Sequence, residues 1–399
     1  MQLDFKSFFK NIFGGKGETQ QEMQHAVLLS GTPYYTNNSG NTYDISLARA
    51  CIHTIANHSA KLQPKYLINN TLQAKSKLQY LLGTRPNPYM STFDFIYKTI
   101  SMLYSSNNVF VYCHSDKNGN IDGFYPIPYK NFELLEARGK FFGRFICNNS
   151  IPLVVPYEEL IHLRRHFNED DFVGSNQLKV LEPTKKLNDS VVESIVNGVQ
   201  TSNKLQGLLK ATTIVQDDEL ESMKNKFVDS YMSLSNTSGV AILDKKLEFQ
   251  QIKLEPVLID EKHMEAVSND LFRYYGISEN IVQSNYSESE YDAFYNGIIE
   301  PLAIQFSEEL TSKILTEREI QSGAKIILSA ERMGYASMET RVKAIQTLMP
   351  LGILSINESR KIMEMDDIEN GERHLVSLNF VDLDKANKYQ VGETENDVQ

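Results

Sequence analysis

The sequence predicts an α+β protein made of more than one folding unit, and three observations support this. The chain has 399 residues, whereas domains usually hold about 100–200 residues. Its first half mixes helical periodicity with strand patterns, and its second half is mainly helical with one short α/β insert. With 41% hydrophobic and 23% charged residues, the composition is that of a globular protein rather than a collagen-like or disordered one.

The N-terminal segment, residues 1–42, does not show the periodicity of a helix or of a strand over its full length. Residues 14–42 are rich in Gly, Gln, Ser, Thr and Asn, which predicts a linker or mobile arm. Before it, residues 5–13 fit a short amphipathic helix that ends at Gly14, and docking onto a neighbouring subunit is favoured over membrane anchoring. No apolar run approaches the roughly 18–20 residues that span a bilayer, so we expect no membrane partner.

The first compact unit begins near Tyr43. Apolar residues spaced three and four apart predict helices over 47–62 and 92–105, the second with Thr92 as a possible cap. The pattern then changes to strand, turn and strand, over 109–113, 117–120 and 121–127. Further strands are predicted over 132–135, 141–146 and 160–163.

A helix follows Gly174, with an apolar stripe of Leu187, Val191, Ile195 and Val199. A second, uncharged polar stripe on this helix consists of Ser190, Ser194, Asn197 and Thr201. Both simple solvent exposure and a pore-lining role explain this stripe. Residues 204–257 then predict a compact insert with a strand near 208–214, a helix over 217–231, and strands over 240–243 and 247–254.

The chain returns to helix over 258–275 and stops at Gly276. The inward face predicted for this helix carries Met264, Val267, Leu271 and Tyr274. A polar loop over 276–289 leads to a long helix that opens with Ser287 and Glu290 in capping-box spacing. Pro301 lies inside its apolar repeat, so we expect a kink there.

After the long helix, a short strand is predicted over 326–328 and helices over 338–349 and 356–365. Ser355 and Glu358 form another predicted capping box at the start of the last helix. Residues from about Ala386 onward are polar, and we expect them to be disordered.

The charge of the chain argues against tight DNA binding. The net charge is −11 and the pI about 5.3, whereas proteins that neutralise phosphates carry basic patches. Residues 358–399 hold 5 basic and 11 acidic side chains, a balance of −6, so the acidity is concentrated near the C-terminus. Acidity is nevertheless compatible with a wall past which DNA slides without sticking.

No motif for catalysis, cofactor binding or metal binding stands out. The Gly14–Gly17 run does not fit a phosphate-binding loop, and neither HExxH nor GxSxG occurs. Three cysteines without CxxC spacing indicate neither a disulfide framework nor a cysteine zinc site. His162 and His166 are interpreted as a surface pair, and Glu288, Glu290 and Asp292 as acidic residues favoured at a helix start. We therefore expect no catalytic residue, metal or cofactor.

The order of several short motifs resembles the portal protein family of tailed bacteriophages, of the type with long non-contractile tails. The N-terminal run "PNP … GNAY … rDxxG … L.PL.P" of that family is similar to Arg85–Pro88, Asn107–Tyr112, Asp116–Asn120 and Gly123–Pro128. The later elements "GxSpl", "fgvP" and "G.lt.NE.R" are similar to Val173–Leu178, Tyr274–Ser278 and Gly352–Arg360. The resemblance covers roughly residues 45–390.

Two departures from the family pattern concern backbone conformation. Asn107 stands where the family has a glycine, and asparagine also adopts the left-handed conformation. Ser278 replaces the proline before the loop. The family's frequent tryptophans are absent, since the chain has none.

The resemblance implies a portal fold with an α/β wing, two stem helices, a small α/β clip, a tunnel loop with a long kinked helix, and a helical crown. The implied domains are a flexible N-terminal arm over 1–42, a wing over 43–176, a stem helix over 177–203, a clip over 204–257, a second stem helix over 258–275, a tunnel loop over 276–289, a long kinked helix returning to the wing over 290–330, a crown over 331–385 and a disordered acidic tail over 386–399.

The resemblance also implies a function without bond chemistry. Family members form a homo-oligomeric ring, typically a dodecamer, at one capsid vertex of the virion, after assembly in the host cytoplasm. Double-stranded DNA is packaged and ejected through the ring without sequence specificity. The implied protein partners are the terminase large subunit, the head–tail connector and the major capsid protein. Another phage structural or scaffold-like protein, and a metal-dependent DNA-processing enzyme, are the alternatives.

Specific residues are expected at the contacts of such a ring. We expect the stem stripe Ser190, Ser194, Asn197 and Thr201 and the loop residues Gln283, Ser284, Asn285 and Ser287 to face DNA, because neutral polar groups touch phosphates through water without a strong electrostatic grip. Docking of partners on the clip is expected at Lys210, Asp217, Asp218, Glu221 and Lys224.

Overall fold

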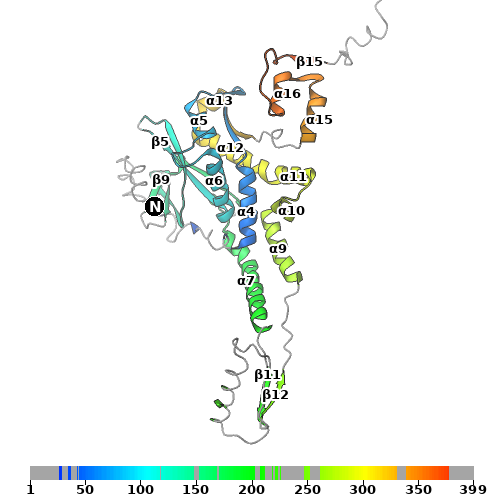
Figure 1. Ribbon diagram of the computed structural model, residues 1–399. Helices are drawn as coiled ribbons and strands as arrows, with labels where there is room; N and C mark the ends of the chain where they lie inside the picture. The colour runs from blue at the N-terminus through cyan, green and yellow to red at the C-terminus, as the bar shows by residue number, and fades with distance from the viewer. Residues whose placement is uncertain are drawn as a thin grey trace, which may run out of the picture. The chain divides into compact units, whose positions relative to one another are not determined.

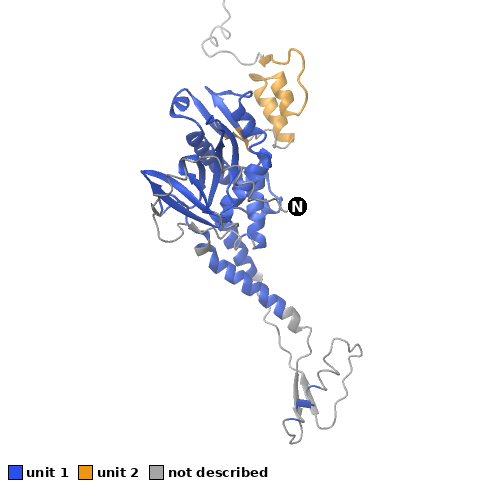
Figure 2. Ribbon diagram, turned by 90° about the vertical axis from the view of Figure 1, so that its left-hand side faces the viewer, with its two compact units in different colours: residues 1–61, 65–327 blue, residues 62–64, 328–399 orange. Residues whose placement is uncertain are grey.

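A computed structural model describes most of the chain between residues 43 and 376. The described residues are 27–28, 35–36, 43, 45–116, 118–147, 152–168, 170–202, 207–211, 218, 221–222, 225, 247–251, 261–329 and 338–376, of which a few short stretches are described by their backbone alone. The chain divides into two compact units, one of residues 1–61 and 65–327 and one of residues 62–64 and 328–399 (Figure 2).

Two antiparallel sheets pack face to face in the first unit (Figure 1). One sheet has the order β10-β5-β6, formed by Leu160–Arg164, Asn108–Ser115 and Ile121–Pro126. The other contains β7 (Asn131–Ala137), β8 (Lys140–Ile146) and β9 (Pro152–Pro156), and two short strands, β1 (Val27–Leu28) and β2 (Tyr35–Thr36), pair with β7.

Aromatic side chains fill the space between these sheets. The ring of Phe110 on β5 stacks on that of Phe132 on β7, with centroids 4.5 Å apart, and lies 5.0 Å from that of Phe145 on β8. All three are fully buried. Since burying one such ring contributes about 1.5–3 kcal/mol, this cluster is a main source of stability for the unit.

Helices cover the other face of the β10-β5-β6 sheet. Those in contact with the sheet are α6 (Thr92–Ser106) and α12 (Glu300–Ile314), and α4 (Ser46–Ser59) packs against α6. Phe95 on α6 packs between Phe124 of β6 and Phe306 of α12, with each pair of ring centroids 6.3 Å apart. Shorter elements of this region are β3 (Gln63–Ile68), β4 (Thr71–Leu72), α5 (Lys77–Gly83), the 3-10 turn η1 (Tyr157–Glu159), α13 (Glu317–Gln321) and β13 (Ala324–Ser329), in which β3 pairs with both β4 and β13.

Two further helices and a series of short elements complete the first unit. The helices are α7 (Gln177–Ser202) and α9 (Glu261–Tyr275), and β11 (Gly207–Ala211) pairs antiparallel with β12 (Leu247–Gln251) between them in the chain. After α9 come α10 (Glu279–Val282), α11 (Glu288–Phe294) and the π-helical turn η3 (Tyr295–Ile299), which continues into α12.

The second unit contains α15 (Met338–Leu348), β14 (Leu351–Ser355), α16 (Ile356–Ile362) and β15 (His374–Val376). The two strands pair antiparallel, and α15 and α16 both contact β14. The predicted capping box at the start of the last helix is confirmed, because Ser355 accepts from the Glu358 N–H and the Glu358 carboxylate accepts from the Ser355 N–H.

The α+β fold class is confirmed, and several local predictions need correction. The cap of α6 is Ser91, which forms a capping box with Asp94, while the hydroxyl of Thr92 donates to the carbonyl of Leu82. Met264 points outward with 48% exposure, although Val267 and Leu271 are buried as predicted. The loop over 276–289 contains the helix α10, because Ile281 is buried and anchors it.

Some elements escaped prediction from the sequence, and some predictions concern residues that are not described. β3, α5 and β9 are additional elements, and Val27–Leu28 and Tyr35–Thr36 are strands inside the predicted linker. The predicted helices over 5–13 and 217–231, the strand over 240–243 and the tail from 386 lie wholly or largely outside the described residues. Among the described helices, none is long and apolar enough to cross a membrane.

Candidate functional site

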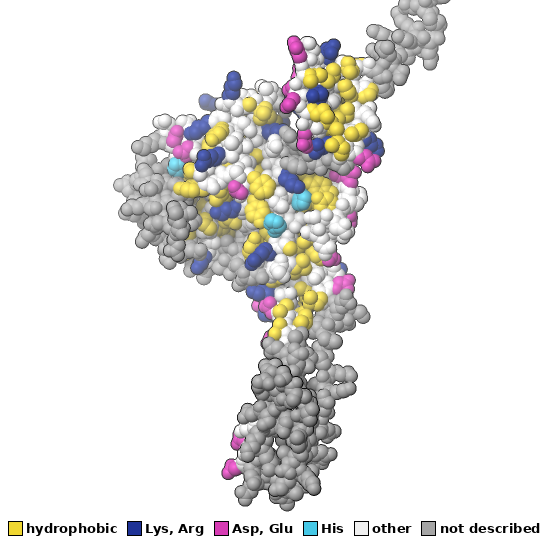
Figure 3. Space-filling view, viewed as in Figure 1, with side chains coloured by type: hydrophobic (Ala, Val, Ile, Leu, Met, Phe, Trp, Pro, Cys, Tyr) yellow, Lys and Arg dark blue, Asp and Glu magenta, His cyan; other side chains and the backbone are white. Residues whose placement is uncertain are grey.

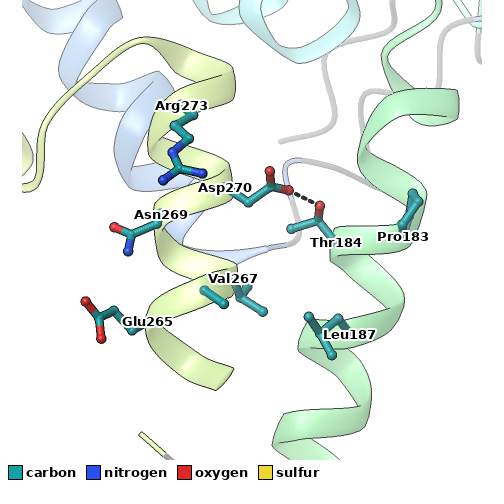
Figure 4. Close-up of a pocket in the computed structure, with 9 residues that line it drawn as sticks. Pro183, Thr184, Leu187, Glu265, Val267, Asn269, Asp270 and Arg273 are labelled. Carbon is teal, nitrogen blue, oxygen red and sulfur yellow. Dashed lines mark hydrogen bonds between the residues drawn. The ribbon is translucent and has the colours of Figure 1, made fainter. Parts of the chain in front are cut away.

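The helices α7 and α9, which correspond to the two predicted stem helices, lie side by side (Figure 4). Val191 of α7 and Val267 and Leu271 of α9 are buried. The hydroxyl of Thr184 donates a hydrogen bond to the carboxylate of Asp270. An open groove of about 550 Å³ lies along the two helices, and its lining includes Leu187 and Arg273.

The uncharged stripe of α7 is exposed where its side chains are described. Ser190, Ser194 and Asn197 are exposed, and Thr201 belongs to the helix by its backbone. The residue next to Ser190 in sequence, Val191, is buried, so the stripe lies away from the buried seam between the helices. The helical wheel places charged residues beside the stripe, and two of them, Glu182 and Lys186, form an ion pair at 2.8 Å.

A buried polar network joins the root of α7 to the sheets. Asn108, the first residue of β5, donates from Nδ2 to the Gly174 carbonyl at 3.0 Å and accepts from the Gly174 N–H at 2.7 Å. A side chain at position 174 would not fit, because its Cβ would lie 2.1 Å from the Arg165 carbonyl oxygen. The glycine of the predicted stem entry is therefore required by the close approach of two backbone segments.

The same network determines the state of His162. The Oδ1 atom of Asn108 is an acceptor, so His162 Nε2, 3.2 Å away, donates to it, and His162 Nδ1 accepts from the Tyr157 hydroxyl at 2.9 Å. Burial, followed by the charges of Arg164 and Lys313, holds the pKa of His162 well below its usual value. The interpretation of His162 and His166 as a surface pair is wrong for His162, since it is 2% exposed.

Asn107 connects the same root to the end of α9. It has φ of 61°, so it adopts the left-handed conformation expected where the family pattern has glycine. Its Nδ2 donates to the Ser175 carbonyl at 3.0 Å and lies 3.2 Å from the Tyr274 hydroxyl. Its own carbonyl accepts from the Arg165 N–H at 2.8 Å.

Gln177 and Tyr275 complete the attachment of the two stem helices. One orientation of the Gln177 side-chain amide gives hydrogen bonds to both its oxygen and its nitrogen. In it, the oxygen accepts from the Tyr275 hydroxyl at 3.0 Å, and the nitrogen donates to the carbonyls of Tyr104 and Ser105. The guanidinium of Arg165 lies over the Tyr104 ring, 3.7 Å from its centroid. Both stem helices are thus fixed to the end of α6 by buried polar and cation–π contacts.

The loop over 276–289 is fixed at both ends and exposed at its tip. Gly276 has φ of 70° and ends α9, as predicted. Ser278 has φ of −89°, close to the range that the family's proline would impose. At the other end, Ser287 and Glu290 form the predicted capping box. The four residues predicted to face DNA, Gln283, Ser284, Asn285 and Ser287, are all exposed.

The side chains of two of these four residues form hydrogen bonds within the loop. The Gln283 amide donates to Glu279 at 2.8 Å, and the hydroxyl of Ser287 contacts Glu290 at 2.9 Å. Behind the loop, the ring of His58 lies 5.4 Å from those of both Tyr291 and Phe294, and Tyr286 stacks on Tyr291. The aromatic contacts hold the base of the loop against α4 and leave 283–285 at its exposed tip.

Pro301 occupies the first turn of α12, directly after the π-helical turn over 295–299. There the Glu300 N–H bonds to the Tyr295 carbonyl, five residues back. Proline lacks an N–H and crowds the preceding turn, so a wider π turn at this point is physically reasonable. The helical path from 288 to 314 is therefore irregular next to Pro301.

The residues predicted to dock partners are only partly described. Lys210 belongs to β11 by its backbone, and Asp218 and Glu221 are exposed, whereas Asp217 and Lys224 lie outside the described residues. Among the residues that the structure describes, no group of three or more His, Cys, Asp and Glu side chains is placed to hold a metal ion. Burial raises the pKa of the thiols of Cys51 and Cys147, to about 12 and about 11.

The family model for the phage portal protein matches residues 46–364, which include α7, α9, the loop over 276–289 and the second unit as far as residue 364. The chain belongs to the phage portal protein family. The match ends just after α16, so it spans nearly all of the described residues.

Two related sequences are those named "Probable portal protein" in Lactococcus phage p2 and Lactococcus phage SK1. Each is 24% identical to this portal-family chain over 204 residues, which cover 48% of the chain and 54% of the relative. The match therefore spans about half the length of each of these relatives.

Solved structures support the same fold. The neck of a native gene transfer agent particle with C12 symmetry matches with a TM-score of 0.59 and 13% identity, covering 88% of this chain and 99% of that one. An HK97-family phage portal protein from Corynebacterium diphtheriae matches with a TM-score of 0.52 and 12% identity, covering 76% and 98%. These likenesses establish the portal fold.

Proposed function

We propose that copies of this chain form a homo-oligomeric ring, typically a dodecamer, at one vertex of a phage capsid, and that double-stranded DNA enters and leaves through the ring. The observation that carries the proposal is the order of elements within the family match. The helix α7 is followed by an insert that contains the β11–β12 pair, then by the helix α9, a polar loop and the long helical segment that ends with α12. The buried network at Asn108 and Gly174 supports a stem held in a fixed direction.

The surface offered to DNA is polar and mostly uncharged. We assign the exposed stripe Ser190, Ser194 and Asn197, with Thr201, to the channel wall, together with the loop tip over 283–285. Hydroxyl and amide groups bind phosphates weakly and through water, whereas lysine and arginine displace counterions and hold DNA. A wall of this kind lets DNA slide in both directions.

The remaining roles follow from the ring. The insert between the stem helices docks the terminase large subunit and later the head–tail connector. The docking residues are Lys210, Asp217, Asp218, Glu221 and Lys224. The major capsid protein surrounds the ring. Phage portal proteins are structural proteins. We accordingly assign no bond chemistry to this chain, and place it in the virion after assembly in the host cytoplasm.

Electron microscopy of the purified full chain in negative stain tests the proposal. A ring with a central hole is the expected result. A protein that remains monomeric over the micromolar range, with sedimentation velocity as the second measurement, would contradict it. A monomer that cleaves DNA when Mg²⁺ is added would favour the metal-dependent enzyme instead.

A further inference from the structure

The charge of the chain is unevenly distributed along the sequence. Residues 45–115, all of which are described, contain 7 basic side chains and 1 acidic one, a balance of +6. Because the whole chain carries −11, the remaining residues carry −17. Proteins that bind nucleic acid gather their cations on one part of the surface, so the local balance matters more than the total. The net charge thus masks a segment with the composition of an anion-binding surface.

An exposed surface around α5 contains part of this charge, and we call it the α5 patch. Its members are all exposed, and they are Lys75, Lys77, Tyr80, Arg85 and Tyr89. Tyr80 and Tyr89 are 54% and 60% exposed, more than any other tyrosine whose side chain the structure describes, so both rings are accessible from solvent. Figure 3 shows Lys and Arg side chains over the upper left of this face, where Figure 1 places α5.

Local contacts bring the members of the α5 patch together. Lys77 and Tyr80 are three residues apart in α5 and therefore lie on the same side of the helix. The Arg85 N–H donates to the Tyr80 carbonyl at 3.2 Å, and the Arg85 guanidinium donates to the Pro88 carbonyl at 2.8 Å. Arg85 consequently connects Tyr80 to the residue that precedes Tyr89, and the patch is one continuous surface.

Further hydrogen bonds fix the patch to the rest of the first unit. The Ser76 side chain caps α5 by accepting from the Gln79 N–H, and the Gln79 side chain accepts from the Tyr66 N–H at 2.6 Å. After α5, the Asn87 side chain donates to the Phe124 carbonyl on β6 at 2.8 Å. Because the backbone beneath the cations is already ordered, a ligand has less entropy to lose when it binds there.

We propose that the α5 patch binds the phosphate backbone of double-stranded DNA. Lysine and arginine side chains are positively charged and only donate hydrogen bonds, and a tyrosine hydroxyl can donate as well. The oxygens of the DNA backbone are negatively charged acceptors, and a large share of protein–DNA hydrogen bonds go to them. A protein surface offers donors and acceptors together, so the α5 patch matches a polyanion better than an ordinary protein partner.

The acidic side chains nearest to the patch are engaged in hydrogen bonds of their own. The Asp94 carboxylate belongs to the capping box of α6. The Asp116 carboxylate, whose charge interacts with that of Lys77, accepts from the N–H groups of Asn118 and Asn120. Part of the negative charge of both residues is thus balanced by N–H groups of the chain, which reduces its repulsion of phosphates.

The proposed contact lies away from the loop assigned to the channel wall. In Figure 1, α5 lies to the left of α4, whereas α10 and α11, which flank the loop tip, lie to its right. The loop tip is neutral, and the α5 patch attracts phosphates, so the patch holds DNA rather than letting it slide. The inference takes from the proposed function only that DNA is present, and it adds a second DNA contact of opposite character.

Binding of covalently closed circular duplex DNA by the full chain tests this inference, because a closed circle cannot thread through a preformed ring. Affinity is measured at several salt concentrations for the wild type and for Lys77→Gln with Arg85→Gln. We expect the double variant to bind about tenfold or more weakly at 0.1 M salt. Its plot of log affinity against log salt should be less steep by about 1.8, which is about 0.9 for each cation removed.

The matched control is Lys130→Gln with Lys140→Gln, which removes the same charge from exposed positions on other elements. This control should keep the wild-type affinity and salt dependence. Lys75→Gln with Lys77→Gln leaves the Arg85–Pro88 hydrogen bond intact and should reproduce the loss, so the test stands even if the Arg85 substitution impairs folding.

Equal affinity and salt dependence of the wild type and both patch variants would overturn the inference. It would also be overturned if the patch variants kept their affinity for DNA and lost binding to a polyglutamate peptide, since the patch would then serve an acidic protein. If no ring forms, the proposed function fails, and a loss of affinity in the patch variants of the monomer would still support the α5 patch. The two failures are therefore distinguishable.

Discussion

Asn108 and Gly174 are joined by two reciprocal hydrogen bonds although they are 66 residues apart in the chain. The side chain of Asn108 thereby satisfies both the N–H and the carbonyl of Gly174, at the point where the chain leaves the sheets and enters α7. The hydrogen bonds of this side chain replace the backbone hydrogen bonds that a helix or sheet would normally provide to Gly174. These two bonds tie the segment that enters α7 to the first residue of β5.

Replacement of Asn108 by alanine should destabilise the first unit by about 2–3 kcal/mol, because the buried polar groups of Gly174 and His162 lose their partner. Urea unfolding of the monomer followed by tyrosine fluorescence measures this loss. Asn269→Ala, at an exposed position of α9, is the matched control and should change the free energy of unfolding by less than about 0.5 kcal/mol. Equal stability of the two variants would contradict the assignment.

Gly174→Ala should also destabilise the protein, by about 1–3 kcal/mol, because the new Cβ meets the carbonyl oxygens of Arg165 and Asn107 at 2.1 and 2.9 Å. Gly297→Ala is the control, since nothing lies within 4 Å of its Cβ and the residue is helical. That variant should be unchanged or more stable by up to about 1 kcal/mol. Thermal unfolding of both proteins decides, and a Gly174→Ala protein with wild-type stability would refute the close approach.

His58 should make the stability of the first unit depend on pH. Burial, and then the charge of Lys61, lowers the pKa of His58 to about 4. Between about pH 6.5 and pH 4 the unfolded chain therefore binds more protons than the folded chain, so stability is greatest above pH 6.5 and falls as the pH decreases. His58→Phe keeps the ring beside Tyr291 and should flatten this dependence.

Unfolding free energies of wild type and His58→Phe at several pH values measure the difference in slope. Lys61→Gln removes the second cause of the lowered pKa and should reduce the slope by a smaller amount. An unaltered slope in His58→Phe would show that other groups carry the acid sensitivity.

Ser287→Ala should loosen the base of the loop. The hydroxyl of Ser287 caps α11, and loss of such a cap typically costs about 1 kcal/mol. We expect faster hydrogen exchange in residues 288–291 at pH 7, with no change in α9. Ser289→Ala is the control, because the hydroxyl of Ser289 contacts the Ser287 hydroxyl and caps no helix. Similar exchange in the two variants would argue against the cap.

The same capping box should respond to acid. Hydrogen bonds from the Ser287 N–H and then from the Asn280 amide lower the pKa of Glu290. The stabilisation of the folded state by the ionised Glu290 carboxylate is therefore present at pH values above its ordinary pKa of 4.5. It is lost as the pH falls through the lowered pKa of the folded state. Asn280→Ala should raise the pKa of Glu290, which a carbon-detected NMR titration of the carboxyl measures. A pKa that does not move would exclude the Asn280 contact.

Lysines at the loop tip should impede DNA movement. The double variant Gln283→Lys with Asn285→Lys adds two charges that bind phosphates, so packaging in vitro should slow while ring assembly is unchanged. The variant Gln283→Ser with Asn285→Ser keeps the tip neutral and should package normally. Normal packaging by the lysine variant would count against placing this loop at the DNA.

Local patterns in the sequence predicted the elements whose signals lie within a few residues. The capping boxes at Ser287 and Ser355 and the stop at Gly276 are correct, since caps and left-handed turns depend on immediate neighbours. β9 was missed because prolines stand at both of its ends, where they weaken a strand pattern without excluding pairing. Ser91 was passed over as a cap in favour of its neighbour Thr92, because both are good capping residues.

The sequence by itself determined the α+β class, the order of the longer helices, and the resemblance to portal proteins, because these follow from periodicity and from motifs in a fixed order. Only the tertiary structure decided that His162 is buried and neutral, that Asn108 holds Gly174, and that Asn107 reaches Tyr274, 167 residues away. Burial and hydrogen-bond partners depend on which distant segments meet. That information is a property of the folded chain as a whole, and a pattern that spans three or four residues does not contain it.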